Sequence, residues 1–142
     1  MRIKAPLDFQ RVQPMQTEAC PFCSISTGRI LAETALTLTI RDRFPVSPDH
    51  TLIVPKRHFA DLFEATSDEI REIWQALAQV AGQIRPADGF NIGVNVGAAA
   101  GQTVMHLHIH LIPRYAGDQP DPRGGIRRIF PEQADYWNPE RS

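Results

Sequence analysis

The chain has 142 residues, in which 15 lysines and arginines nearly balance 16 aspartates and glutamates, and 42% of the residues are hydrophobic. This size and composition are typical of one soluble globular domain with a hydrophobic core. Because positive and negative charges nearly cancel, the chain as a whole has almost no net charge that would attract nucleic acid or an anionic membrane. No apolar run approaches the roughly 20 residues of a membrane-spanning helix, and residues 1–30 lack a signal-peptide pattern, so we expect a cytoplasmic protein.

The N-terminal part combines an irregular arm with a pair of cysteines. Residues 1–18 show no sustained hydrophobic period, so we expect an arm without regular structure, followed by a core over 19–116 and a C-terminal extension over 117–142. The core begins with Cys20 and Cys23, the only cysteines of the chain. Two cysteines are too few for a secreted disulfide framework, and their spacing is typical of a metal or redox pair.

Three segments of the core have the pattern of strands. Residues 34–41 alternate threonine with apolar residues, 50–55 form a short apolar run that ends at a proline, and 90–96 alternate apolar residues with Asn and Gly. A fourth strand is predicted over the histidine-rich residues 101–114, which end in a proline and an arginine.

Residues 66–85 are the clearest helix. Thr66 and Glu69 form a capping box, and an apolar stripe that includes Ile73, Trp74 and Leu77 recurs at helical spacing. We expect this stripe, Trp74 included, to pack in the core. The order strand, strand, helix, strand, strand with short connections predicts an α+β domain with a mostly antiparallel sheet.

The predicted strand 101–114 carries the most distinctive pattern. It contains three of the five histidines, His106, His108 and His110, each followed by an apolar residue. On one strand face these imidazoles lie about 7 Å apart. The spacing alone leaves two chemistries open, chelation of a metal such as zinc or nucleophilic attack by an imidazole beside donors that bind an anion. A third interpretation is that the histidines only satisfy hydrogen bonds in a polar groove.

The residues before this strand favour anion binding. Loop 97–101 consists of Gly and Ala, which let backbone N–H groups approach an anion closely. Gln102, Thr103 and Asn95 add neutral donors, so the loop has the makings of an oxyanion cradle. Such a loop also often does no more than turn the chain. No P-loop or Rossmann glycine pattern is present in the sequence.

Residues 101–113 resemble the signature of the histidine triad superfamily, in which Gly-Gln-Thr/Ser-Val precedes three histidines that alternate with apolar residues. The resemblance covers about residues 19–116. Further family positions are occupied by Asp42, His50, His58 and Asn95. The resemblance implies a HIT-like fold, with an antiparallel sheet of about five strands and one long helix packed on it. It also implies a homodimer.

The resemblance also implies a nucleotide hydrolase in which His108 is the nucleophile. His108 would attack the α-phosphorus to form a nucleotidyl-imidazole that water hydrolyses, while its other ring nitrogen keeps its proton against a backbone carbonyl. The other implied site residues are His110, Gln102 and Thr103 for the phosphate and leaving group, Asn95 and Gly101 beside them, Asp42 for the ribose hydroxyls, and Leu36, Phe22 and Ile25 for the wall around the base.

In branches of the family that carry a CxxC motif near the start, the cysteines have metal-binding partners. The resemblance implies that Cys20, Cys23, His50 and His106 bind zinc, and a closed set of four ligands makes a structural site. The alternative is a pair of buried free cysteines without metal. A redox pair is disfavoured because no thioredoxin-like βαβ unit surrounds it.

The third histidine and the residues after it limit the candidate substrate classes. His110 stands where nucleotidylyltransferases of the superfamily have Gln, which favours hydrolysis, and 113–118 is similar to the dinucleoside polyphosphate hydrolases. The alternatives are a phosphoramidate hydrolase, a zinc-stabilised nucleotide-binding module with little catalysis, and a catalytic zinc hydrolase that uses all three histidines. Arg123, Arg127 and Arg128 are candidates for the distal phosphates or for a solvated, dimer-wrapping tail.

Overall fold

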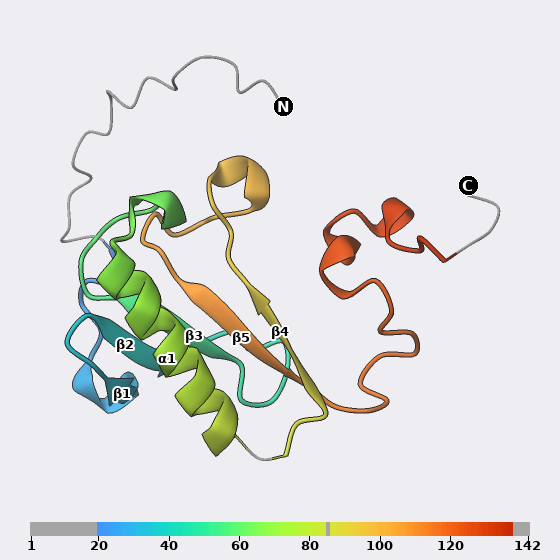
Figure 1. Cartoon of the computed structure of the whole chain (residues 1–142), viewed down its shortest axis with the longest axis horizontal. Helices are drawn as coiled ribbons and strands as arrows, with labels where there is room; N and C mark the ends of the chain where they lie inside the picture. Colours follow the sequence, from blue (N-terminus) through green and yellow to red (C-terminus); the bar gives the residue numbers. More distant parts are fainter. Residues whose placement is uncertain (1–19, 85, 138–142) are drawn as a thin grey trace.

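A computed structural model describes residues 20–84 and 86–137, and in it one helix packs on a five-stranded sheet (Figure 1). The elements are β1 (Ile30–Glu33), β2 (Thr37–Arg41), β3 (Thr51–Pro55), α1 (Ser67–Gln83), β4 (Gly89–Gly93) and β5 (Ile109–Arg114). The strand order is β1-β2-β3-β5-β4 and every neighbouring pair is antiparallel. The predicted α+β fold is confirmed. The N-terminal arm expected over 1–18 lies outside the described residues.

The helix α1 begins where the capping box predicts. The Thr66 side chain accepts a hydrogen bond from the Glu69 N–H, and the Glu69 carboxylate accepts one from the Thr66 N–H. The stripe that contains Ile73 and Leu77 is buried against the sheet, but Trp74 is 58% exposed, so its assignment to the core was wrong. Its position on the helix places it beside the stripe and not within it. The predicted last residue, Arg85, lies outside the described residues.

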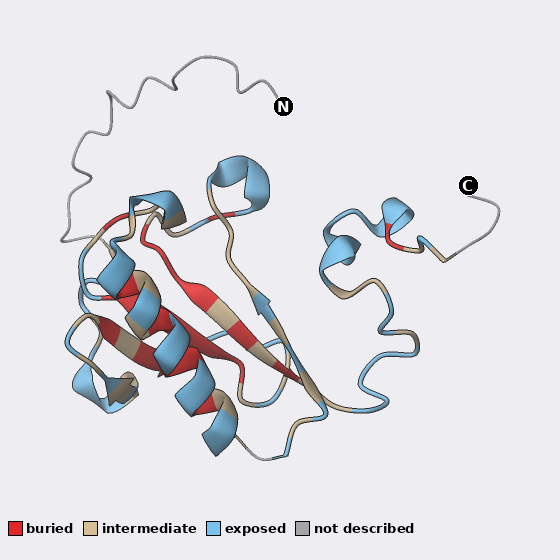
Figure 2. Ribbon diagram, viewed as in Figure 1, coloured by how far each residue is buried: buried red, intermediate tan, exposed pale blue. Residues whose placement is uncertain are grey.

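The sheet has a core on each face. On the face that α1 covers, Ile53, Leu107, Ile109 and Leu111 form one core cluster with Ile73 and Leu77 of the helix. Figure 2 shows buried positions along the central strands and along α1. On the other face, Ile40, Leu52 and Val54 form a smaller core with Phe22, Ile25 and Ile30 packed against it. Because side chains alternate along a strand and Leu52 pairs with His110, His110 lies on the face away from α1.

Several strand bounds need correction. The strand expected over 90–96 is observed as β4 and ends at Gly93. The strand expected over 34–41 begins only at Thr37, because the Thr34 hydroxyl accepts hydrogen bonds from the Leu36 and Thr37 N–H groups in a tight turn. An additional strand, β1, precedes that turn. The histidine strand begins only at Ile109, since the Leu107 N–H donates to the carbonyl of Phe59, beyond the end of β3, and not to the ladder.

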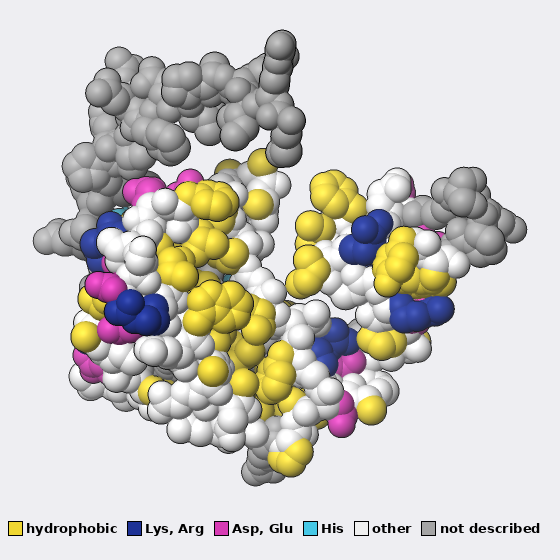
Figure 3. Space-filling view, in the orientation of Figure 1, with side chains coloured by type: hydrophobic (Ala, Val, Ile, Leu, Met, Phe, Trp, Pro, Cys, Tyr) yellow, Lys and Arg dark blue, Asp and Glu magenta, His cyan; other side chains and the backbone are white. Residues whose placement is uncertain are grey.

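The C-terminal extension leaves the sheet after β5 and projects to one side of the body of the protein (Figure 3), where its residues 125–129 contact β4. It contains the 3-10 helices η5 (Gly125–Ile129) and η6 (Pro131–Gln133). The adjacent aromatics at its end pack on arginines of the same segment, Trp137 under Arg123 and Tyr136 under Arg127. Within the described part of the chain no helix is both long and apolar enough to span a bilayer.

Candidate functional site

A pocket of about 470 Å³ opens on the sheet face away from α1 and joins residues from four parts of the chain. Its described lining residues are Pro21, Phe22, Arg29, Asp42, Arg43, Phe44, Val46, His50, Leu52, Thr103, Val104, His108 and His110. The pocket therefore collects two of the three alternating histidines together with Asp42 and His50. It has an aromatic wall on one side, because the Phe22 ring lies 5.1 Å from the His108 ring.

His108 is held in one tautomer. Its Nδ1–H donates to the backbone carbonyl of His106 at 2.8 Å, which is the contact expected from the sequence. In the neutral ring the remaining nitrogen, Nε2, then carries a lone pair and no proton. Since His108 is buried yet lines the pocket, this nitrogen is the group that a ligand there meets.

A second chain of hydrogen bonds fixes His50 and His110. The Val46 N–H donates to His50 Nδ1 at 3.3 Å, so His50 carries its proton on Nε2, which lies 3.0 Å from His110 Nδ1. His110 Nδ1 is therefore the acceptor and its proton sits on Nε2. Asp42 Oδ2 lies beside the pair, 3.5 Å from His50 Nε2 and 3.9 Å from His110 Nδ1.

Both histidines of this pair are neutral near pH 7. Burial lowers the pKa of His50, against an opposing effect of Asp42. Burial, followed by the neighbouring His108 and His50, lowers the pKa of His110 to about 4. A neutral His110 with its proton on Nε2 is a hydrogen-bond donor, which suits a role at a phosphate oxygen or a leaving group.

Gln102 holds the loop before the histidines. Its side chain is buried, the carbonyl oxygen accepts from the Gly97 N–H at 2.8 Å, and the amide donates to the carbonyls of Ala60 and Val104 at 3.0 and 3.2 Å. With its amide engaged in this way, Gln102 acts on the site by shaping the loop. Gly97 has a φ of 83°, which only glycine adopts without strain.

The other predicted donors differ in their positions. Thr103 lines the pocket, whereas Asn95, Gly101 and Gln102 are not among its described lining residues. Of the residues suggested for the base, only Phe22 reaches the pocket, while Leu36 and Ile25 are not among those lining residues.

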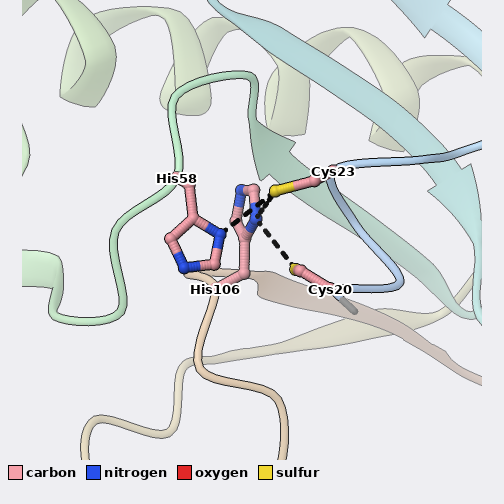
Figure 4. A group of neighbouring side chains, drawn as sticks. All are labelled: Cys20, Cys23, His58 and His106. Atoms are coloured by element: carbon pink, nitrogen blue, oxygen red, sulfur yellow. Dashed lines mark hydrogen bonds between the residues drawn. The ribbon is translucent and has the colours of Figure 1, made fainter. Parts of the chain in front are cut away.

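The cysteines form a second cluster with two histidines (Figure 4). Cys23 Sγ lies 3.1 Å from His58 Nδ1, and His106 Nδ1 lies 3.5 Å from both Cys20 Sγ and Cys23 Sγ. Tetrahedral zinc with ordinary Zn–S and Zn–N bonds places sulfur and nitrogen about 3.6 Å apart. The donor set and its spacing therefore fit a zinc ion.

The surroundings of His106 support this assignment. Its Nε2–H donates to the Pro55 carbonyl at 2.8 Å, which leaves Nδ1 bare toward the two sulfurs, as metal-binding histidines require. Burial lowers the pKa of His106 and keeps the ring neutral. Burial, followed by Cys20, raises the pKa of Cys23, which disfavours a reactive redox thiolate.

His50 does not join this cluster, and the predicted ligand set is corrected at that position. His50 precedes β3, whereas His106 contacts the last residue of β3, Pro55. Five residues of extended strand separate the two ends by about 16 Å. His58 lies just beyond Pro55 and takes the fourth place.

Two charged residues of the pocket were missed from the sequence. Arg29 ends the 3-10 helix η2 (Thr27–Arg29), and Arg43 follows Asp42 after β2, yet both line the pocket. The arginines predicted for this role, Arg123, Arg127 and Arg128, are not among its described lining residues. The sequence contained one usable signal, the position of Arg43 directly after Asp42.

Comparison with known proteins agrees with this geometry. A model of the HIT domain matches residues 25–117. The chain is 34% identical over 131 residues to Protein hit from Bacillus subtilis, across 87% of this chain and 86% of that protein. It is 39% identical over 106 residues to adenylylsulfatase HINT3 from Arabidopsis thaliana, across 70% of this chain and 54% of that protein.

A solved structure shows the same fold. The zinc-bound histidine triad family protein from Mycobacterium smegmatis superposes with a TM-score of 0.63 at 35% identity, covering 75% of this chain and 86% of that one. Sequence, domain match and fold agree, and the chain belongs to the histidine triad (HIT) family.

Proposed function

We propose that this protein is a nucleotide hydrolase that cleaves at the α-phosphate of a dinucleoside polyphosphate through a covalent nucleotidyl intermediate on His108. The observation that carries the proposal is the 2.8 Å hydrogen bond from His108 Nδ1–H to the His106 carbonyl. In the neutral ring this bond leaves Nε2 with a free lone pair, and His108 lines a pocket large enough for a nucleotide. The similarity to an adenylylsulfatase supports an adenylyl-type substrate.

The reaction has two steps. In the first, His108 Nε2 forms a bond to the α-phosphorus as the bond from phosphorus to the leaving-group oxygen breaks. His110 Nε2–H donates a hydrogen bond to that oxygen as negative charge develops on it, and the leaving group departs as a phosphate anion that exchanges protons with solvent. In the second, water forms a bond to the phosphorus as the bond from phosphorus to His108 Nε2 breaks, and the proton of the water passes to solvent. Asp42 accepts hydrogen bonds from the ribose hydroxyls.

A phosphoramidate hydrolase is the nearest alternative, because His108 would attack the same α-phosphorus and only the leaving group differs. A binding module with little catalysis is the alternative from another class. The two enzyme readings differ in the charge of the leaving group, and the binding module differs from both in having no turnover.

We also propose that Cys20, Cys23, His58 and His106 hold a structural zinc ion. Four protein ligands leave no open position for water, so the ion would supply a cross-link and no Lewis acid for the substrate. The cross-link ties the Cys20–Cys23 knuckle to the end of β3 and to the loop before β5. The knuckle carries Phe22, whose ring contacts that of His108.

A homodimer joined along β4 is the assembly we propose. This strand is at the edge of the sheet, and its Phe90 and Ile92 side chains are 37% and 40% exposed. Light scattering on the full chain tests this proposal, with a monomer at micromolar concentration as the contradicting result.

The experiment that tests the function is a turnover assay with diadenosine tetraphosphate on the wild type and on His108→Asn. The asparagine variant keeps a polar side chain but has no nucleophilic nitrogen, so we expect loss of turnover with retained binding of adenosine monophosphate. Rapid acid-free quenching and intact-mass analysis should show a nucleotidyl adduct only on the wild type. Full turnover by His108→Asn contradicts the proposal, and tight binding without turnover by the wild type supports the binding module.

A further inference from the structure

We propose that Ser47 is a positioning residue for His110, because its hydroxyl holds the loop whose Val46 N–H decides which ring nitrogen of His110 carries the proton. This inference rests on the proposed hydrolase function, in which His110 donates to the leaving group, and it adds a residue outside the catalytic pocket. Ser47 belongs to the 42–50 loop, which connects β2 to β3, and it is not among the described lining residues of that pocket.

A single proton lies between His50 and His110, and either ring can carry it. His50 Nε2 and His110 Nδ1 are 3.0 Å apart and both rings are neutral near pH 7, so one of the two nitrogens donates and the other accepts. In the first arrangement, called the donor tautomer, each ring has its proton on Nε2. In the second, called the acceptor tautomer, each ring has its proton on Nδ1 and His110 Nε2 is bare. Only the donor tautomer has an N–H on His110 for the oxygen of the leaving group.

The Val46 N–H distinguishes the two tautomers. It donates to His50 Nδ1 at 3.3 Å, and this nitrogen has a lone pair only in the donor tautomer. In the acceptor tautomer the same nitrogen carries a proton, so two N–H groups would face each other without an acceptor. Asp42 does not decide between the tautomers, because its Oδ2 lies 3.5 Å from His50 Nε2 and 3.9 Å from His110 Nδ1, beyond the range of a good hydrogen bond to either ring.

The Ser47 hydroxyl fixes the 42–50 loop to β5, the strand that carries His110. It donates to the Pro113 carbonyl at 2.6 Å. Pro113 is fully buried, and a buried carbonyl needs a hydrogen-bond partner. The register of β3 and β5, continued outward, would place Asp49 opposite Pro113, but Asp49 has a φ of 64° and leaves the strand conformation. The side chain of Ser47 therefore replaces a contact that the backbone of the sheet does not make.

These contacts form a closed ring of interactions that begins and ends on β5. Its members are His110, His50, Val46, Ser47 and Pro113. The bond from Val46 is the longest of its three hydrogen bonds, so it is the first to weaken when the loop shifts. Loss of the Ser47 hydroxyl therefore acts on His110 through the tautomer and not through contact with the substrate.

The first measurement uses the full-length, zinc-loaded wild type at pH 7. Ring ¹⁵N chemical shifts from NMR distinguish a protonated nitrogen from a bare one in each histidine. We expect His50 and His110 both to carry the proton on Nε2. A wild-type His110 with its proton on Nδ1 overturns the inference, and this result does not depend on whether any variant folds.

The variants are Ser47→Ala and Ser47→Thr, with Ser67→Ala as the matched control. Ser67 is an exposed serine at the start of α1, on the opposite face of the sheet. Ser47→Ala should keep its loop, because two backbone hydrogen bonds that close the loop do not use the hydroxyl. They run from the His50 N–H to the Ser47 carbonyl at 3.1 Å and from the Asp42 N–H to the His50 carbonyl at 3.0 Å. Zinc content and melting temperature show whether each variant is folded.

We expect Ser47→Ala to move the ratio of the two tautomers toward the acceptor tautomer by about fivefold or more, the effect of losing one hydrogen bond to a buried group. The ring shifts of His50 and His110 should change together. The kcat for diadenosine tetraphosphate should fall about twofold or more, while KM stays the same. Ser47→Thr keeps a hydroxyl and should restore the wild-type shifts and most of kcat. Ser67→Ala should match the wild type in both measurements.

Unchanged ring shifts of His110 in folded Ser47→Ala overturn the inference even if kcat falls, because a loss of kcat alone would come from a general loosening of the loop. Changed shifts with an unchanged kcat overturn the link from the tautomer to the leaving group. A wild type with the expected tautomers but no turnover refutes the proposed hydrolase function. The NMR result distinguishes that outcome from a failure of the Ser47 contact.

Discussion

The neutral state of His110 predicts a loss of stability in mild acid. The His110 side chain is 22% exposed, and burial, followed by His108 and His50, lowers its pKa from 6.5 to about 4. The unfolded chain therefore takes up a proton near pH 6.5, whereas the folded protein takes it up only near pH 4. The contribution of this pKa difference to the free energy of unfolding is fully present above pH 6.5 and is lost as the pH falls to 4. The whole shift corresponds to about 3 kcal/mol, of which about 2 kcal/mol is lost at pH 5.

The assay is urea unfolding at pH 7 and pH 5, on the wild type and on His110→Gln at equal zinc saturation. Glutamine keeps a polar amide but does not titrate, so the wild type should lose about 2 kcal/mol more than the variant between the two pH values. The ring of His110, followed by NMR, should titrate with a midpoint near pH 4. A midpoint near 6.5, or equal losses in the two proteins, refutes the reasoning.

Three further predictions concern groups around the site. Cys23→Ser should lower the zinc content from one ion per chain, measured by elemental analysis, and lower the melting temperature, and an unchanged melting temperature would argue against a structural ion. The pKa of Glu69 is lowered to about 2, chiefly by its hydrogen bonds with Arg57. Because Arg57 is half exposed, Glu69→Gln should cost only about 1–2 kcal/mol in urea unfolding at pH 7, a difference that must disappear as the pH falls from 4.5 toward 2. Gln102→Ala leaves the Gly97 N–H without its partner, so kcat should fall while zinc content stays at one per chain, and an unchanged kcat would contradict a loop-shaping role.

The parts of the fold that the sequence predicts are those with local causes. The capping box of Thr66 and Glu69 marks the start of α1 because both partners lie within one helical turn. The alternation of His106, His108 and His110 identifies the family because the spacing belongs to one short segment. The hydrogen bond of His108 to a backbone carbonyl was implied by the resemblance, and the structure identifies the acceptor as the carbonyl of His106, two residues away.

The site residues that the sequence did not predict depend on where the strands end and on which strand ends lie close together. His50 and His58 lie on either side of β3, and only the contact of His106 with Pro55 decides between them. Arg29, just before β1, and Arg43, just after β2, reach one pocket because these two strands pair antiparallel with Ile30 opposite Ile40. In both cases the prediction needed the tertiary structure, because the sequence shows residues of suitable chemistry but not which residues lie beside them in space.

One residue, His106, connects the two clusters. Its ring lies beside the two thiols, and its backbone carbonyl accepts the hydrogen bond from His108 Nδ1–H. Cys23 is exposed to solvent. A metal chelator therefore has a route to inhibition that never enters the nucleotide pocket: once the proposed zinc ion is removed, the loop that orients His108 loses its anchor. Such an inhibitor would lower kcat without being displaced by saturating nucleotide.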